Sequence, residues 1–173
     1  MHLLYMYNFN KLLTNYDLID ICAKLNINLI DVVNKDMLIN LEPQRGCYII
    51  NLQDARDGGG THWVALILDD YVSYYDSFGL HLSEDVSQFI SWYLHSANID
   101  NDDCIYNSTQ FQNMNSILCG YFCVYFLWFH TVMYSDIKDN KYLMGEHNSN
   151  FSKTNTLKND IQIKRLFNNI INK

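Results

Sequence analysis

The sequence has few basic residues and only one proline. Its 173 residues include 12 Lys and Arg against 19 Asp and Glu, a formal net charge of -7. Because phosphate contacts need clustered Lys and Arg, this balance argues against a general nucleic-acid-binding function and leaves only local basic patches for such a role. The lone proline, Pro43, predicts a turn before the next element of structure.

The cysteines are too few and too irregular for a disulfide framework. There are five of them, an odd number, and their spacing shows no repeat. This pattern favours a protein that folds in a reducing compartment.

The N-terminus, MHLLYMYNFNK, lacks a basic start and a clean apolar run, so we expect no signal peptide. One long stretch, residues 117–134, contains no charged side chain and approaches the length of a membrane span. It includes Gly120, His130 and Thr131, and a helix that is apolar on all sides can equally be the central helix of a globular domain. We favour the globular interpretation and expect no membrane association.

The composition, 49% hydrophobic and 14% aromatic, is sufficient for a sizeable core, and the length predicts a single domain over residues 1–173. Hydrophobic periodicity predicts helices over residues 16–25, 83–95, 118–134 and 157–171. Either Thr14 or Asn15 can cap the first helix. Runs of β-branched and aromatic residues predict strands over residues 45–52, 62–68, 72–76 and 103–107, of which the second and third form a hairpin.

Three of the helices have a stripe of apolar side chains that we expect to be buried. In the first helix the stripe is Leu18, Ile19, Cys22 and Leu25. In the second it is Val86, Phe89, Ile90, Tyr93 and Leu94. In the last it is Leu157, Ile161, Leu166, Phe167, Ile170 and Ile171. Residues 27–44 have a mixed pattern that predicts no element, and residues 135–156 are polar and predicted to be mobile. Strands and helices without regular alternation indicate a compact α+β fold.

Cys119 has the most reactive predicted position in the chain. It lies in the first turn of the predicted helix 118–134, where unpaired N–H groups and the positive end of the helix dipole stabilise a thiolate. Gly120 adds no side chain, so a substrate carbonyl could approach the first-turn amides closely, as an oxyanion site requires. Considered alone, Cys119 can also be a small buried hydrophobe.

Catalysis by a cysteine needs a base, a group that orients the base and a donor for the oxyanion. His62 follows a glycine-rich connector, residues 57–61, and begins a strand. Asp76 ends the partner strand of the hairpin, where its carboxylate could hold the Nδ1 proton of His62. Gln112 precedes Cys119 by seven residues and could direct its amide at the oxyanion. Each of the three also has an ordinary structural interpretation, as a satisfied histidine, a turn former and a solvated amide.

A metal site is not expected. Cys119, Cys123 and His130 fall on one helical face, but Cys119 and His130 would be about 16 Å apart, too far to share one ion. Cys123 is then expected to be a packing residue or a neighbour of the site, and Cys47 in the strand 45–52 is expected to be a core residue.

Three segments resemble the adenovirus-type maturation cysteine proteases, in the same broad group as the proteases that cut SUMO and ubiquitin-like conjugates. They are GTHWVALILD at residues 60–69, YYDSFG at residues 74–79 and QNMNSILCGYFCVYFL at residues 112–127. The third is similar to the family's signature Gln-x-x-Asn-Ser-x-x-Cys-Gly-x-Phe-Cys. The resemblance spans residues 60–130, fits the N-terminal region only loosely and does not extend to the last 40 residues.

The resemblance implies a cysteine-protease fold, with a small mixed sheet flanked by helices and the nucleophile at the N-terminus of a buried central helix. It implies Cys119 as nucleophile, His62 as general base and acid, and Asp76 as orienting acid. It also implies Gln112 as oxyanion donor, with Gln110 as the alternative. Three further positions follow from it: Trp63 beside the cleft, Gly120 next to the nucleophile, and Cys104 as the partner of an activating peptide in a disulfide.

The resemblance further implies an endopeptidase that forms a thioester with capsid or other virion precursors, in a virus or a virus-like element such as a virophage or Polinton-type transposon. We expect a monomer that needs no cofactor for its chemistry and works in the virion and the host-cell cytoplasm. The acidic balance argues against activation by DNA. The alternatives are a protease that removes ubiquitin-like tails and a catalytically silent interaction domain.

Overall fold

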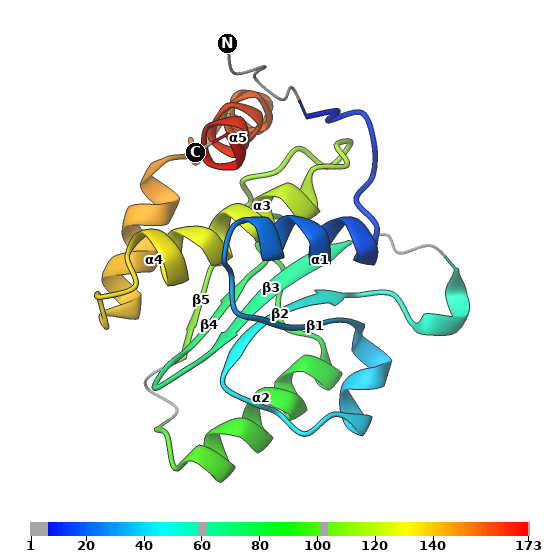
Figure 1. Ribbon diagram of the computed structural model, residues 1–173, viewed down its shortest axis with the longest axis vertical. Coiled ribbons are helices and arrows are strands. Elements are labelled where there is room, and N and C mark those ends of the chain that lie inside the picture. Colours follow the sequence, from blue (N-terminus) through cyan, green and yellow to red (C-terminus); the bar gives the residue numbers. More distant parts are fainter. Residues whose placement is uncertain (1–6, 59–61, 101–103, 173) are drawn as a thin grey trace.

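A computed structural model describes residues 7–58, 62–100 and 104–172 (Figure 1). Two sequence predictions fall partly outside these residues. They are the glycine-rich connector 57–61, of which residues 59–61 are not described, and the predicted strand 103–107, of which Asp103 is not described. The described residues form a mixed sheet with helices against both of its faces.

The sheet has five strands in the order β1-β2-β3-β4-β5. These are β1 (Leu29–Asn34), β2 (Gly46–Asn51), β3 (Trp63–Leu68), β4 (Val72–Tyr75) and β5 (Cys104–Tyr106). Among the three central strands, β3 is antiparallel to both β2 and β4, and β3 and β4 form the predicted hairpin. The two edge strands, β1 and β5, each run parallel to the strand beside them.

Within the described residues, five α-helices pack around the sheet: α1 (Asn15–Lys24), α2 (Glu84–Ala97), α3 (Cys119–Trp128), α4 (Asn140–Ser149) and α5 (Thr156–Ile171). Two short 3₁₀ turns, η1 (Lys35–Asn40) and η2 (Ala55–Asp57), follow β1 and β2, and one π-helical turn, η4 (Phe129–Met133), continues α3. In Figure 1, α1 and α3 lie over one face of the sheet and α2 lies over the other.

Alternate residues of the central strands enter two different cores. Cys47 and Ile49 of β2 pack in the cluster that contains α1, α3 and α5, whereas Tyr48 and Ile50 pack in the cluster that contains α2. Every residue of β2 and β3 is therefore buried. A sheet covered on both faces needs continuous apolar strands, which explains the composition of these segments.

The central helix α3 is buried along its whole length, so its uniformly apolar sequence reflects its position between the sheet and other helices. No helix among the described residues is both long and apolar enough to cross a bilayer. The sequence predicts one helix over residues 118–134. In the structure, α3 ends at Trp128 and the π-helical turn η4 follows it directly.

Three elements of the fold, β1, η1 and α4, were missed by the sequence pattern. Residues 27–44 contain β1 and η1, and the polar stretch 135–156, predicted to be mobile, contains α4. The buried positions of α4 are Asn140, Leu143, Met144 and His147, and because two of the four are polar they give a weak apolar pattern.

The α2 stripe is confirmed in full, while the stripes of α1 and α5 are partly wrong. In α1, Ile19 is 46% exposed and Ile21 is buried instead. In α5, Leu157 and Ile161 are 66% and 72% exposed, and the first turns bury Asn159 instead. The hydrogen bonds of Asn159, described below, explain why a polar residue faces inward there.

Two histidines lie in the core where α4 packs against α3 and η4. His130 is 1% exposed and His147 is fully buried, and their ring centroids are 6.0 Å apart. Burial lowers the pKa of His147 to about 4, and burial together with the nearby His147 lowers the pKa of His130 well below its ordinary value. Both rings are therefore neutral at pH 7.

This histidine pair predicts a loss of stability in mild acid. The unfolded chain takes up protons at these residues below about pH 6.5 whereas the folded chain does not, so the stability present above pH 6.5 is lost as the pH falls toward the folded pKa. Between pH 7 and pH 5, His147 alone lowers the free energy of unfolding by about 2 kcal/mol. Urea unfolding at both pH values should show a smaller loss in His147→Phe than in the wild type. The exposed His81→Asn variant should match the wild type, and equal losses in all three proteins would contradict the assignment.

Candidate active site

The β3–β4 hairpin brings His62 and Asp76 to one edge of the sheet. His62 immediately precedes β3 and Asp76 immediately follows β4, and antiparallel pairing places these two ends side by side. The carbonyl of His62 also accepts a hydrogen bond from the backbone N–H of Leu52, just after β2. Nε2 of His62 lies 2.7 Å from Oδ1 of Asp76, and both side chains are buried.

The ring of His62 is oriented differently from the sequence-based prediction. We expected Asp76 to hold Nδ1, but it pairs with Nε2, the ring nitrogen farther from the backbone, which can reach the next strand. Phe78 stacks on the imidazole with ring centroids 4.4 Å apart and restrains this orientation. Among the described residues Nδ1 has no hydrogen-bond partner, so it is the nitrogen left for a reacting group.

Two residues near Asp76 that sequence reasoning missed hold this residue in place, one through its backbone and one through its carboxylate. The backbone N–H of Asp76 donates to Oδ1 of Asn107, and Nδ2 of Asn107 donates to the Asp76 carbonyl, both at 2.7 Å. The N–H of Phe78 donates to the carboxylate oxygen that also faces His62. Asn107 ends the predicted strand 103–107, but no sequence pattern indicates its buried pairing with Asp76.

Several interactions set the charge of His62. Burial lowers its pKa, but the hydrogen bond to Asp76 and the nearby Cys119 thiol outweigh burial and raise the pKa to about 9. The side chains of His62 and Cys119 are close enough to interact electrostatically, and Nδ1 has no hydrogen-bond partner among the described residues. Contacts of this kind often tighten only when substrate binds.

Cys119 is the first residue of α3 and is 2% exposed. The residue before the helix, Leu118, provides no side-chain cap, so the first-turn N–H groups are not satisfied by a capping side chain. These amides and the helix dipole favour negative charge beside the sulfur. Cys123, one turn later, is fully buried, and burial raises its pKa well above the ordinary value, so it is the less reactive thiol.

Gly120 has a packing role. A Cβ atom at this position would lie 3.2 Å from Cδ1 of Leu13 and 3.3 Å from Cδ2 of Leu18. The small residue therefore lets α3 approach the N-terminal segment and α1 closely. The prediction that it also gives a substrate carbonyl access to the helix amides stays a prediction.

Gln112 is fully buried and its amide is held at both ends. Its Oε1 accepts from the Ser77 hydroxyl at 2.6 Å, and its Nε2 donates to the Ser116 carbonyl at 2.8 Å. A carboxamide nitrogen carries two hydrogens, so one remains for a second acceptor. The backbone carbonyl of Ser77 also accepts hydrogen bonds from the N–H groups of Phe111 and Gln112. Ser77, which sequence reasoning missed, thus joins the Gln112 loop to the turn after Asp76.

The alternative donor, Gln110, is half-buried, and its Nε2 donates to the Gln112 carbonyl at 3.0 Å. This bond gives Gln110 a part in holding the loop.

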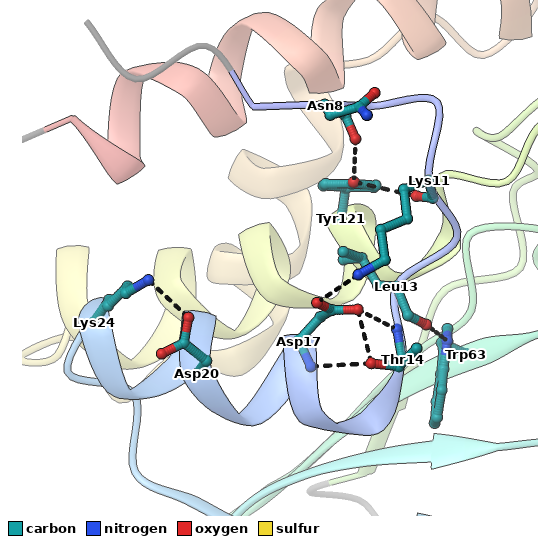
Figure 2. Close-up of polar contacts among 9 residues, drawn as sticks. All are labelled: Asn8, Lys11, Leu13, Thr14, Asp17, Asp20, Lys24, Trp63 and Tyr121. Carbon is teal, nitrogen blue, oxygen red and sulfur yellow. Dashed lines mark hydrogen bonds and ion pairs between the residues drawn. The ribbon is translucent and has the colours of Figure 1, made fainter. Parts of the chain in front are cut away.

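Trp63, the residue after His62, borders a cavity. Its indole N–H donates to the Leu13 carbonyl at 3.0 Å, and Figure 2 shows this bond at the end of the N-terminal segment. Trp63 lines a cavity of about 280 Å³, together with Leu12, Leu13, Thr14, Asn15, Val32, Asn34, Asn51 and Gly58. The same N-terminal segment is held to α3 because the Tyr121 hydroxyl donates to the carbonyls of Asn8 and Lys11 (Figure 2).

Cys104 lies away from the other candidate residues. It is half-buried in the edge strand β5 and aligns with Val72, at the end of β4 opposite Asp76. Within the described ranges, no group of three or more His, Cys, Asp or Glu side chains could hold a metal ion.

Comparison with known proteins identifies the family. The profile of the adenovirus endoprotease family matches residues 32–169. The chain belongs to the adenovirus endoprotease family. It is therefore a cysteine peptidase, a hydrolase whose substrates are polypeptides. The match covers most of the C-terminal region, so the prediction that the resemblance excludes the last 40 residues was wrong.

The fold agrees with this membership. The chain is similar to the crystal structure of the ASFV pS273R protease, with a TM-score of 0.53 and 13% sequence identity, over 93% of this chain and 67% of that one. It also aligns with the SUMO protease Ulp1, with a TM-score of 0.47 and 13% identity, over 93% and 77% of the two chains. A comparison with curated protein sequences gives no match. The predicted α+β cysteine-protease fold is confirmed.

The pairing of His62 with Asp76 predicts the effect of removing the negative charge. In Asp76→Asn the ionic hydrogen bond is lost while burial remains, so the pKa of His62 should fall from about 9 by more than one unit. An NMR titration of the ring measures this shift, and peptide turnover should fall about 100-fold or more because the base is no longer oriented. Asp69→Asn, in the turn between β3 and β4, is the matched control. An unchanged His62 titration in Asp76→Asn would contradict the assignment.

Proposed function

We propose that this peptidase is an endopeptidase that cleaves virion precursor proteins, with Cys119 as nucleophile, His62 as base and acid, Asp76 as orienting acid and Gln112 as oxyanion donor. The main support is the buried His62–Asp76 pair at 2.7 Å, whose imidazole interacts with the thiol at the N-terminus of α3. Membership of the adenovirus endoprotease family supports the class of substrate.

The proposed reaction begins from the ion pair in which the proton of Cys119 Sγ resides on Nδ1 of His62, a state that the raised pKa of the ring favours. The thiolate attacks the scissile carbonyl carbon, and the resulting oxyanion accepts hydrogen bonds from the Cys119 backbone N–H and Gln112 Nε2. The imidazolium, stabilised by Asp76, then gives its proton to the leaving amine as the C–N bond breaks. This step leaves a thioester between Cys119 and the N-terminal part of the substrate.

Water completes the reaction. His62 removes a proton from a water molecule as the oxygen attacks the thioester carbonyl, and the tetrahedral intermediate forms in the same oxyanion site. The C–S bond breaks, the product leaves as a carboxylic acid, and the thiolate recovers its proton from His62. These steps use only groups of the protein and one water molecule, so we propose that no cofactor takes part in the chemistry.

The remaining assignments also belong to this proposal. The protease would act as a monomer in the virion and the host-cell cytoplasm, in a single domain over residues 1–173. An activating peptide could bind covalently through Cys104, because β5 is an edge strand and this side chain is half-buried.

Single replacements test the proposal. Cys119→Ala and His62→Ala should each lower peptide turnover by more than about 1,000-fold, since each removes a group that reacts directly. Cys123→Ala should keep its activity, because that thiol is buried and unreactive. Circular dichroism checks that each variant is folded. Equal loss in Cys123→Ala, or full activity in Cys119→Ala, would show that the nucleophile is wrongly assigned.

The same proteins identify the substrate. Incubating the wild type with virion precursor proteins, and sequencing the new termini, should reveal defined cuts that Cys119→Ala does not make. A parallel incubation uses proteins extended at the C-terminal glycines of ubiquitin-like modifiers. Cleavage of those fusions alone would replace the maturation function with deconjugation, and the absence of any cleavage would favour a silent interaction domain.

A further inference from the structure

The first turns of α5 hold the loop that carries Gln112. Oδ1 of Asp160 accepts the backbone N–H of Asn113 at 3.2 Å, and Nδ2 of Asn159 donates to the Phe111 carbonyl at 3.0 Å. The two residues that flank Gln112 are thus bound by two consecutive residues of one helix. A longer contact, 3.5 Å between Nδ2 of Asn113 and the Thr156 hydroxyl, lies at the same place.

Asn159 occupies a position where the amphipathic pattern of α5 would favour an apolar residue. It is 1% exposed, while Leu157 and Ile161 on either side of it are largely exposed. Besides the Phe111 carbonyl, it binds the N–H and the carbonyl of Ser152, both at 2.7 Å. A buried carboxamide is tolerated only when its polar atoms are satisfied, and here one of its bonds is made to the Gln112 loop.

The same helix is tied to the helix that carries the proposed nucleophile. Phe167, two turns after Asp160, packs edge-on against Tyr121 of α3, with ring centroids 5.0 Å apart. Tyr121 is two residues after Cys119. Helix α5 therefore spans the distance between the Gln112 loop and α3 and fixes one relative to the other.

The loop is also held by Ser77, next to Asp76. Gln112 thus lies between two supports, the turn after β4 and the N-terminal turns of α5. Only Ser77, in the turn after β4, binds Oε1 of Gln112. The loop backbone that carries Gln112 is held both by Ser77 and by Asn159 and Asp160 of α5.

We infer that Asn159 and Asp160 are positioning residues that set the orientation of the Gln112 amide toward the oxyanion. The inference rests on the proposed function, because it gives these residues a purpose only if Gln112 stabilises the oxyanion. Under this inference, α5 helps to stabilise the oxyanion of the transition state and does not change the reactivity of the Cys119 thiol.

The test uses Asp160→Ala, which removes the acceptor of the Asn113 N–H from a half-buried site. A small displacement of an oxyanion donor is costly, so kcat for a cleavable peptide should fall about tenfold or more while KM stays within about twofold. The rate at which iodoacetamide alkylates Cys119 should stay within about twofold, because alkylation forms no oxyanion. Binding of a peptide aldehyde, whose adduct does form one, should weaken in proportion to kcat/KM.

Two further variants separate positioning from folding. Asp160→Asn keeps an oxygen that accepts from Asn113 and should recover most of the lost kcat. Asp139→Ala removes a carboxylate that likewise accepts a backbone N–H, that of Tyr142 at the start of α4, but does not face the loop. It should retain wild-type kcat, and thermal melts of both Ala variants report any general loss of stability.

Wild-type kcat in Asp160→Ala would overturn the inference, as would a loss of alkylation rate equal to the loss of kcat, which would indicate a general disturbance of the site. If the wild type does not cleave peptides through Cys119 at all, the proposed function fails, and the inference fails with it for a separately visible reason.

Discussion

The buried pair of His62 and Asp76 is the interaction on which the rest of the site depends. A carboxylate and an imidazole out of water are stable together only when their geometry is held, because each would otherwise lose its hydration without compensation. The hairpin supplies this geometry by bringing the start of β3 and the end of β4 to one edge. Asn107 then fixes the backbone of Asp76, and Phe78 holds both the carboxylate, through its N–H, and the imidazole, by stacking on it. The raised pKa of His62 is the electrostatic result.

The second constraint is the complete burial of α3, which turns a helix N-terminus into a fixed point beside that pair. The helix cannot shift along the sheet without opening the core, so Cys119 keeps its position relative to β3. Segments from both ends of the chain contribute to this. The N-terminal segment packs Leu13 against Gly120 and holds the indole of Trp63, and α5 packs Phe167 against Tyr121. Residues far apart in the sequence thus form one rigid frame around the proposed active site.

The sequence predicted the parts of this arrangement that local physics determines. Alternating and continuous apolar runs identified four of the five strands, and the capped stripe of α2 was correct at every position. Chemistry and spacing offered His62, Asp76 and Cys119 as candidates, and the resemblance to the adenovirus-type proteases implied their roles. The prediction that Asp76 binds Nδ1 of His62 was wrong, because the orientation of the ring depends on Phe78 and on the distance between the strands. The support from Ser77, Asn107 and Asn159 was missed because buried amides and hydroxyls pair over long separations and leave no periodic signal. The same reason explains α4, whose inward face includes Asn140 and His147.

The central claim is that Cys119, His62 and Gln112 act on one carbonyl group. A crystal structure of the protein with a peptide aldehyde tests it most directly, because the adduct imitates the tetrahedral intermediate. The account predicts a covalent bond from Cys119 Sγ to the aldehyde carbon, with Nδ1 of His62 facing the sulfur. It also predicts Nε2 of Gln112 within about 3 Å of the new oxygen. An adduct on another cysteine, or an oxygen directed away from both Gln112 and the first turn of α3, would contradict it.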